Sequence, residues 1–438
     1  MTEEMSGYRG KALGILKDSK VQVGDVVRVT MGGETLEGTL MPRYELADDE
    51  HIVIKLRNGY NIGVETSPSL KVEGVGARAK PAFTSLLPVE EKEELPTVAV
   101  VSTGGTIASR IDYRTGAVRP ALTSEDILSA VPELSDIANL RAEVLFALLS
   151  ENIHIPQWAA MAKTAAKHIE GKVDGVVICH GTDTMAYTSA ALSFALQNLP
   201  VPVVLVGSQR SSDRPSSDAA MNLINAVRAA ASAPIAEVVI GMHETISDTA
   251  TVLLRGTKVR KLHTSSRDAF KPVNSSPLAR VEGCKISMLV DDYVRRDSGR
   301  KLVLKAEFSD KVALVKFHPS FNPRVIKWYV DEGYRGIILE GTGLGHVGEN
   351  CFPAIEKAAD KGVFVGMCSQ CMCGRVNMKV YDTGRDLLRL GVTPLEDTSS
   401  ETAFVKLSWV LGQYRDLDDV RRVMTTNIAG EIDPRSVY

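Results

Sequence analysis

Residues 98–102 read Val-Ala-Val-Val-Ser, and the next five residues read Thr-Gly-Gly-Thr-Ile. The first run is almost wholly apolar, which is typical of a strand buried on both faces of a parallel sheet. Similar runs follow at residues 175–179, 201–206 and 237–241, with helical stretches between them. The alternation predicts an α/β domain whose parallel sheet is covered by helices on both sides.

Composition changes on either side of this region predict three domains. Before it, short β-rich runs with turns at Gly32-Gly33 and Asn58-Gly59 indicate a small antiparallel barrel. Proline and charge runs mark the breaks. The boundaries that we expect are an N-terminal barrel at 1–85, a linker at 86–96, a catalytic domain at 97–290, a second polar linker at 291–310 and a smaller α/β domain at 311–438.

The overall composition is that of an ordinary globular protein. Hydrophobic residues make up 44% of the chain and charged residues 24%, and the formal net charge is -3. This charge argues against a protein whose main task is to neutralise a phosphate backbone, so we expect any RNA contact to be local or to be made by a partner. The first ten residues lack an apolar signal region, and no apolar run is long enough to span a bilayer, so we expect a cytoplasmic protein.

The six cysteines are too few for the disulfide framework of a small secreted domain. Cys368, Cys371 and Cys373 lie close together, but no second Cys or His pair with zinc-finger spacing follows them. We therefore expect reduced, structural or incidental thiols and no metal on this chain.

Hydroxyl-bearing turns follow two of the predicted strands. Thr106 closes the turn after residues 98–102, and His180-Gly-Thr-Asp-Thr184 comes directly after residues 175–179. Ligands collect at the carboxyl ends of the strands in such sheets, so both turns are predicted to face one site. His180 fits a structural, hydrogen-bonded residue better than a catalytic base. Lys261, in a polar stretch without a clear helical or strand pattern, would on these grounds be read as a surface charge.

The two turns together resemble the motifs of bacterial-type L-asparaginases, and the resemblance runs from about Val98 to the C-terminus. It implies a two-domain α/β core of parallel sheets flanked by helices. It also implies that Thr106 is the nucleophile and that Tyr113, on the loop that follows, helps to activate it. Thr182, Asp183 and Lys261 would form a second hydroxyl relay.

The same resemblance implies how the substrate is bound. Ser150 and Glu151 would hold its α-carboxylate and α-amino groups, with Asp183 also binding the amine. Gly105 and Gly181 belong to the turns around the substrate. An amide is a poor electrophile, so its hydrolysis needs an activated hydroxyl and backbone N–H groups that stabilise the oxyanion.

Other segments distinguish the chain from simple asparaginases. The N-terminal β region, with residues 24–28 and 55–63, resembles the family of D subunits of archaeal glutamyl-tRNA(Gln) amidotransferases. The further segments that carry this resemblance are 207–218, 341–346, 369–370, 374–377 and 427–432. Together they extend it over nearly the whole chain.

The second resemblance implies a division of labour between subunits. This chain would release ammonia from glutamine, and an E subunit would bind Glu-tRNA(Gln), use ATP and Mg²⁺, and form Gln-tRNA(Gln). No cofactor is expected on this chain. We expect a homodimer through the asparaginase core and a two-plus-two heterotetramer with the E subunits, in which the partner makes most of the tRNA contacts.

Three alternatives remain at this point. A free-standing asparaginase or glutaminase would share the catalytic residues but not the N-terminal region. A dinucleotide-binding enzyme is suggested by the glycines of Gly343-Leu-Gly-His-Val-Gly348, although the acidic residue expected after the next strand is absent. A non-catalytic scaffold would require Thr106 or Lys261 to be misplaced in space.

Overall fold

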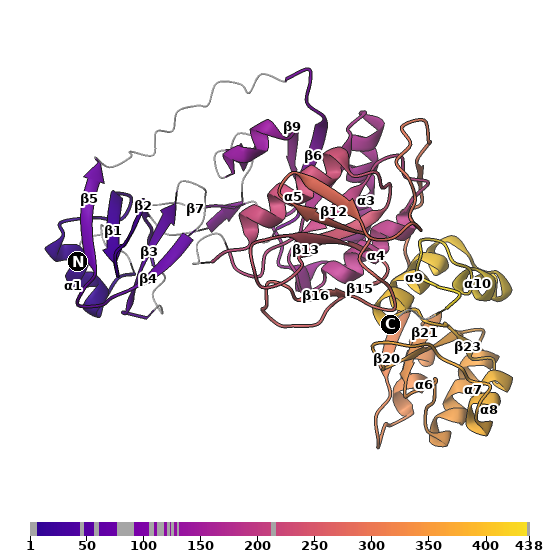
Figure 1. Cartoon of the computed structure of the whole chain (residues 1–438). Helices are drawn as coiled ribbons and strands as arrows, with labels where there is room; N and C mark the ends of the chain where they lie inside the picture. Colours follow the sequence, from indigo (N-terminus) through magenta and orange to yellow (C-terminus); the bar gives the residue numbers. More distant parts are fainter. Residues whose placement is uncertain are drawn as a thin grey trace.

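The computed structural model describes residues 7–43, 48–56, 61–76, 92–104, 109–111, 118–120, 123, 127–128, 131–211 and 216–435. Three parts, each with its own sheet, follow one another in Figure 1. We call them the N-terminal domain (7–76), the central domain (92–310) and the C-terminal domain (311–435). The predicted turn at Asn58 and Gly59 and most of the predicted linker at 86–96 lie outside the described residues.

The N-terminal domain is a five-stranded antiparallel sheet with one helix against it. Its elements are α1 (Gly10–Asp18), β1 (Val26–Met31), β2 (Glu34–Leu40), β3 (His51–Leu56), β4 (Asn61–Glu65) and β5 (Lys71–Gly76), and the strand order is β4-β3-β2-β1-β5. On β1, Val27 and Val29 are buried between less buried neighbours, and they share a core with Ala12 and Leu16 of α1. The alternation explains why this region reads as short, half-buried strands.

The central domain is built on an eight-stranded sheet of order β18-β17-β14-β13-β12-β10-β6-β9. Its strands are β6 (Thr97–Ser102), β9 (Asn139–Val144), β10 (Gly175–Cys179), β12 (Val203–Val206), β13 (Val238–His243), β14 (Thr251–Arg255), β17 (Ala279–Glu282) and β18 (Lys285–Met288). The five strands from β9 to β13 are parallel, and four of them lie at the predicted apolar runs. The fifth, β9, is a half-buried edge strand that was not predicted. The sequence prediction did not include the antiparallel strands β14, β17 and β18. The connections from β13 to β14 and from β17 to β18 are too short to hold a crossover helix, so the chain reverses direction there. Residues 256–278, between β14 and β17, form a separate two-stranded hairpin instead of a helix.

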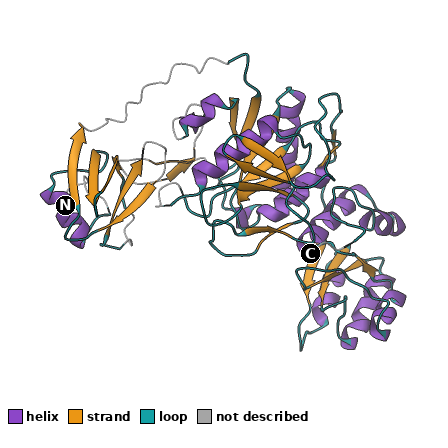
Figure 2. Cartoon of the chain, in the orientation of Figure 1, coloured by secondary structure: helices purple, strands orange, loops and turns teal. Residues whose placement is uncertain are grey.

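Alternate residues of the buried strands face opposite layers of helices. Ala99 and Val101 pack with α3 (Ile155–Glu170) and α4 (Met185–Ala195), whereas Val98 and Val100 pack with α5 (Ala219–Ser232). Figure 2 shows these helices around the strands of the central sheet. Burial on both faces is the reason for the unbroken apolar runs.

The C-terminal domain has a four-stranded parallel sheet of order β20-β21-β22-β23. Its elements are β20 (Val312–Lys316), α6 (Arg324–Asp331), β21 (Gly336–Gly341), α7 (Phe352–Asp360), β22 (Phe364–Ser369), α8 (Asp382–Arg389), β23 (Thr393–Pro394), α9 (Ser400–Gln413) and α10 (Leu417–Met424). Residues of α6, α7 and α8 share one core with the sheet. With the central sheet, this gives the two-domain core of parallel strands flanked by helices that the sequence predicts.

Helix α9 joins the central and C-terminal domains. Its Leu407 packs in the same core as Ile338 of β21, and its Trp409 stacks on Phe194 of α4 with ring centroids 5.9 Å apart. The stretch at 291–310 is also attached to the central domain, because Arg296 donates to the carbonyl of Ala230 at the end of α5. The two domains therefore share a continuous core.

No helix in the described part of the chain is long and apolar enough to cross a membrane. The six cysteines are all unpaired, with Cys179, Cys351 and Cys368 buried. Over the same residues, no group of three or more His, Cys, Asp and Glu side chains has the arrangement of a metal site.

Candidate active site at the carboxyl edge of the central sheet

The turn after β6 is held against the end of β10. The amide and hydroxyl groups of Thr103 both donate to the carbonyl of Cys179, at 3.0 and 2.9 Å. Gly104 has a φ of +120°, and a Cβ there would lie 2.0 Å from the carbonyl oxygen of Leu148, so the turn requires glycine. Of the residues predicted for this turn and the loop after it, Gly105, Thr106 and Tyr113 lie outside the described residues.

The second turn lies between β10 and α4, beside Ser150. A Cβ on Gly181 would lie 2.9 Å from Cβ of Ser150, and the hydroxyl of Thr184 donates to the carbonyl of Ser150 at 2.6 Å. Ser150 is buried and begins the short helix η3 (Ser150–Asn152), on which Glu151 is exposed. The structure thus brings Ser150, Glu151 and Gly181 to the same edge of the sheet as the turn after β6.

Lys261 reaches the second turn from another part of the chain. Its Nζ lies 2.9 Å from Oγ1 of Thr182 and 2.7 Å from Oδ1 of Asp183. The lysine side chain is 14% exposed, whereas that of Asp183 is 68% exposed. Lys261 ends β15 (Val259–Lys261), which pairs with β16 (Phe270–Pro272), so the polar stretch that showed no clear strand pattern in the sequence contains a strand.

This arrangement can move a proton. An ammonium group between a hydroxyl and a carboxylate donates to both, and after losing a proton the amine can accept one from the hydroxyl. The exposed carboxylate remains open to a ligand. The geometry therefore has the groups that a hydroxyl relay needs, at the carboxyl edge where substrates of α/β proteins bind.

His180 stabilises the second turn from its buried side. It is buried, its Nδ1 donates to the carbonyl of Gly181 at 2.6 Å, and its Nε2 accepts from the hydroxyl of Thr188 at 2.9 Å. Trp158 donates its indole N–H to the same hydroxyl. Burial lowers the pKa of His180 to about 4 against the opposing effect of the Gly181 carbonyl, so the ring is neutral at pH 7.

We predict that His180 makes the protein less stable at acid pH. The pKa of this ring falls from 6.5 when unfolded to about 4 when folded, so the unfolded chain binds more protons in that window. Stability is thus fully present above pH 6.5 and lost as the pH falls toward 4, by up to roughly 3 kcal/mol at about 1.4 kcal/mol per pH unit. Urea denaturation midpoints at several pH values measure the loss.

His180→Gln removes the ionisable ring, so the denaturation midpoint of this variant should change less between pH 6.5 and 4 than that of the wild type. The control is His318→Gln, since His318 is exposed. Equal slopes for wild type and His180→Gln would contradict the prediction.

Sequence reasoning did not single out Asp218, which holds the backbone of residues 209 and 210 after β12. This buried carboxylate accepts from the backbone amides of Gln209 and Arg210 and from the side chain of Asn222. Gly207 lies directly against the second turn. A Cβ at this position would lie 2.8 Å from Cγ2 of Thr182, so the close approach requires glycine. A lone aspartate before a helix gives no sequence signal of this role beyond a possible N-cap.

The glycine-rich turn after β21, at residues 343–348, is packed differently from a dinucleotide-binding turn. A Cβ on Gly345 would lie 2.9 Å from Cγ of Met367 and 3.2 Å from Cβ of Val376, so side chains of the protein itself pack against this turn. In a dinucleotide fold the corresponding glycine gives the pyrophosphate close access to the backbone. The packing argues against the dinucleotide alternative.

Three family models match the chain. The model described as GatD N-terminal domain matches residues 21–75, Asparaginase, N-terminal matches 97–292, and Glutaminase/Asparaginase C-terminal domain matches 311–424. The last two cover the central and C-terminal sheets, and the first covers the five-stranded antiparallel sheet. The three matches therefore follow the three sheets of the structure.

Relatives with all three parts are similar over nearly the full chain. The chain is 51% identical to the D subunit of glutamyl-tRNA(Gln) amidotransferase from Methanothermobacter thermautotrophicus, covering 98% of each chain. It is 53% identical to the protein of the same name from Thermococcus kodakarensis, covering 94% of each. Among solved structures, the thermostable L-asparaginase from Thermococcus kodakarensis superposes with a TM-score of 0.69 and 32% identity, over 77% of this chain and 100% of that one. L-asparaginase I from Vibrio cholerae gives a TM-score of 0.68 and 28% identity, over 77% and 99%.

Proposed function

Because this chain belongs to the family of glutamyl-tRNA(Gln) amidotransferase D subunits, we propose that it hydrolyses glutamine and delivers the ammonia to a partner protein. The observation that carries the proposal is the contact of Lys261 with both Thr182 and Asp183. These residues lie on one edge of the sheet with the turn that leads to Thr106.

In the proposed reaction, Thr106 attacks the carboxamide carbon of glutamine, and Tyr113 on the following loop assists the loss of its proton. Backbone N–H groups of the turns at Gly105 and Gly181 stabilise the oxyanion. The C–N bond breaks with transfer of a proton to the nitrogen, ammonia leaves, and water hydrolyses the ester on Thr106 to glutamate. The relay of Lys261 and Thr182 accepts and returns the proton of the attacking group.

The proposed substrate pocket holds the amino acid end of glutamine. Ser150 and Glu151 bind the α-carboxylate and α-amino groups, and Asp183 adds a second contact to the amine. The 68% exposure of the Asp183 side chain supports this role, because a ligand can reach it while Lys261 holds its Oδ1. Close packing of Ser150 on Gly181 supports a fixed distance between the pocket and the second turn.

The proposed partner is the E subunit, which binds Glu-tRNA(Gln) and uses ATP and Mg²⁺ to activate the glutamyl carboxyl group. Two copies of this chain would form the dimer at the centre of a two-plus-two assembly. The net charge of -3 supports a complex in which the partner makes most of the tRNA contacts.

A free-standing L-asparaginase or glutaminase is the second candidate. It is favoured by the similarity to solved L-asparaginases, which spans 77% of the chain. The N-terminal domain argues against this candidate, because it matches a separate family model, that of the GatD N-terminal domain.

Ammonia release from glutamine distinguishes the two candidates. It is measured for the chain alone, with the E subunit, and with the E subunit, ATP and Glu-tRNA(Gln). We expect the rate to rise at least about tenfold in the last condition, which corresponds to about 1.4 kcal/mol of coupling if the rise reflects a population shift. Equal, fast rates in all three would identify a free-standing amidohydrolase, and no glutamine hydrolysis in any would contradict both candidates.

A further inference from the structure

Residues 255–261, which we call the interdomain strap, bond to both the central and the C-terminal domain. At its start Arg255 forms two bonds to Glu237 of the central domain, at 2.8 and 3.2 Å. Thr257 donates its hydroxyl to the carbonyl of Ala429 at 2.9 Å, and its own carbonyl accepts from Thr402 of α9 at 2.9 Å. Lys261, at the end of the strap, donates to the hydroxyl of Thr182 in the central domain.

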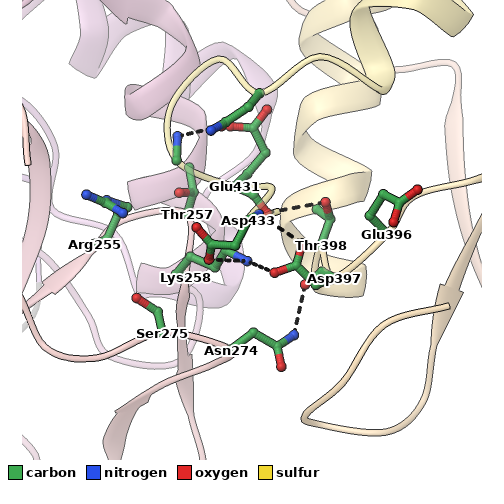
Figure 3. Close-up of polar contacts among 12 residues, drawn as sticks. Arg255, Thr257, Lys258, Asn274, Ser275, Glu396, Asp397, Thr398, Glu431 and Asp433 are labelled. Atoms are coloured by element: carbon green, nitrogen blue, oxygen red, sulfur yellow. Dashed lines mark hydrogen bonds and ion pairs between the residues drawn. The ribbon is translucent and has the colours of Figure 1, made fainter. Parts of the chain in front are cut away.

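Lys258 is the most buried anchor of the strap. Its side chain is 1% exposed and is bonded to Asp397, which is 0% exposed, and to Asp433 at 3.2 Å. The carboxylate of Asp397 also accepts from the backbone amide of Asp433. The backbone carbonyl of Asp397 accepts from the side-chain amide of Asn274. Figure 3 shows this network between the two domains. Each partner is fixed by further bonds, so the position of Lys258 is set from the C-terminal domain.

Arg260 is the second anchor. Its Nε lies 2.8 Å from Oε1 of Glu401 in the first turn of α9. Glu401 is 9% exposed, and the hydroxyl of Ser400 shares its one proton between Oε2 of Glu401 at 3.3 Å and Oε1 of the buried Glu340 at 3.2 Å. Because successive side chains of a strand point to opposite sides, Arg260 of β15 faces one way and its neighbours Val259 and Lys261 face the other. Lys258 lies in the bend directly before this strand.

We infer that Lys258 and Arg260 are positioning residues that hold the ammonium group of Lys261 in the relay, and that the C-terminal domain thereby sets the geometry of the active site. The inference rests on the proposed function. A lysine side chain has four rotatable bonds and does not fix its own Nζ, so the backbone of β15 must be held in place. A displacement of about 1 Å in a catalytic group costs roughly 10²-fold in rate.

The first test compares Arg260→Met with Arg280→Met, using the full-length chain under the condition that gives the highest wild-type rate. Both arginines bond a glutamate through Nε, and their side chains are 32% and 30% exposed. Arg280 lies on β17, opposite Val252 of β14, and its partners Glu244 and Glu282 are not part of the strap. We expect kcat to fall about 10- to 100-fold in Arg260→Met with KM within about threefold, and both constants to be unchanged in Arg280→Met. Unchanged kcat in Arg260→Met would overturn the role of Arg260.

The second test repeats Arg260→Met in a Lys261→Met background, with enzyme in excess so that slow hydrolysis is measured. A residue that acts through Lys261 has no further effect once Lys261 is gone, so the second substitution should change the rate less than about twofold. The same 10- to 100-fold loss in both backgrounds would show that Arg260 has a merely structural role. Normal activity in Lys261→Met alone would instead contradict the relay in the proposed function.

The buried anchor has a matched control in Lys406. Lys406 is also 1% exposed and pairs with the fully buried Glu431 at 2.6 Å, but both residues belong to the C-terminal domain. Lys258→Met and Lys406→Met should lower stability to a similar extent, and only Lys258→Met should reduce kcat in the fraction that remains folded. If Lys258→Met does not fold, kcat is measured for Lys258→Arg instead. This variant keeps the positive charge but has a longer side chain, so it should also lower kcat. Equal kcat in all folded variants would overturn the role of Lys258.

Discussion

Replacing Lys261 by Met should lower glutamine hydrolysis by about 10²- to 10⁴-fold, the range typical of a lost general acid–base group. The substitution removes the ammonium group that lies 2.9 Å from Oγ1 of Thr182 and 2.7 Å from Oδ1 of Asp183. Methionine keeps most of the volume of the side chain, so thermal unfolding should change little. Steady-state ammonia release and calorimetry measure the two effects.

The control for this variant is Lys357→Met. Lys357 forms a comparable pair with Asp331 at 2.6 Å on the surface of the C-terminal domain. It should leave the rate unchanged. Thr106→Val, which removes the proposed nucleophile, should abolish hydrolysis at least as completely as Lys261→Met. Near-normal turnover in either active-site variant would refute the assignment of that residue.

Replacing Glu431 by Gln should lower the free energy of unfolding by about 3–5 kcal/mol, as for other buried ion pairs that lose one partner. Glu431 is fully buried, and its carboxylate accepts from the amides of Ile428 and Ala429 as well as pairing with Lys406. Burial already lowers the pKa of Lys406, and Glu431 opposes that effect. Without the carboxylate, the ammonium group is left with the carbonyls of Met424 and Thr426.

The loss is measured as a shift in the urea denaturation midpoint, followed by tryptophan fluorescence. Adding Lys406→Met to Glu431→Gln should restore part of the lost stability, because no buried charge then remains. The exposed pair of Lys11 and Glu50 provides the control, and Glu50→Gln should change stability by less than about 1 kcal/mol. Similar small shifts for Glu431→Gln and Glu50→Gln would contradict the prediction.

The parallel strands and the two turns could be predicted because their signals are local. Continuous apolar runs such as 175–179 report burial on both faces, and a polar turn directly after such a run lies at the carboxyl edge. The antiparallel strands β14, β17 and β18 were not predicted. β14 is as long as β10, but its apolar run is only Val252-Leu-Leu254, between a threonine and an arginine. β17 and β18 have four residues each and contain charged residues, so none of the three has the longer apolar run on which the prediction depended.

The contact of Lys261 with the second turn could not be derived from the residues alone. Lys261 and Asp183 are 78 residues apart, and pairing over such a distance depends on the tertiary fold. Only the family resemblance singled out this lysine. Lys258 and Arg260 were missed for the same reason, since an isolated cation on a short strand has the sequence signal of a surface charge until its buried partners are known.

The interdomain strap also has a consequence for the order in which the protein matures during synthesis. Lys258 is bonded to a residue 139 positions later in the chain, and Thr257 to one 172 positions later. At about 5–20 residues per second, the ribosome needs roughly 7–28 s to make the 139 residues between lysine and carboxylate. The central sheet is complete well before then, but the bonds that fix Lys261 form only when the end of the chain has emerged. A nascent or truncated chain therefore holds the site without its anchors, and on the inference above the release of ammonia reaches its full rate only once these bonds have formed.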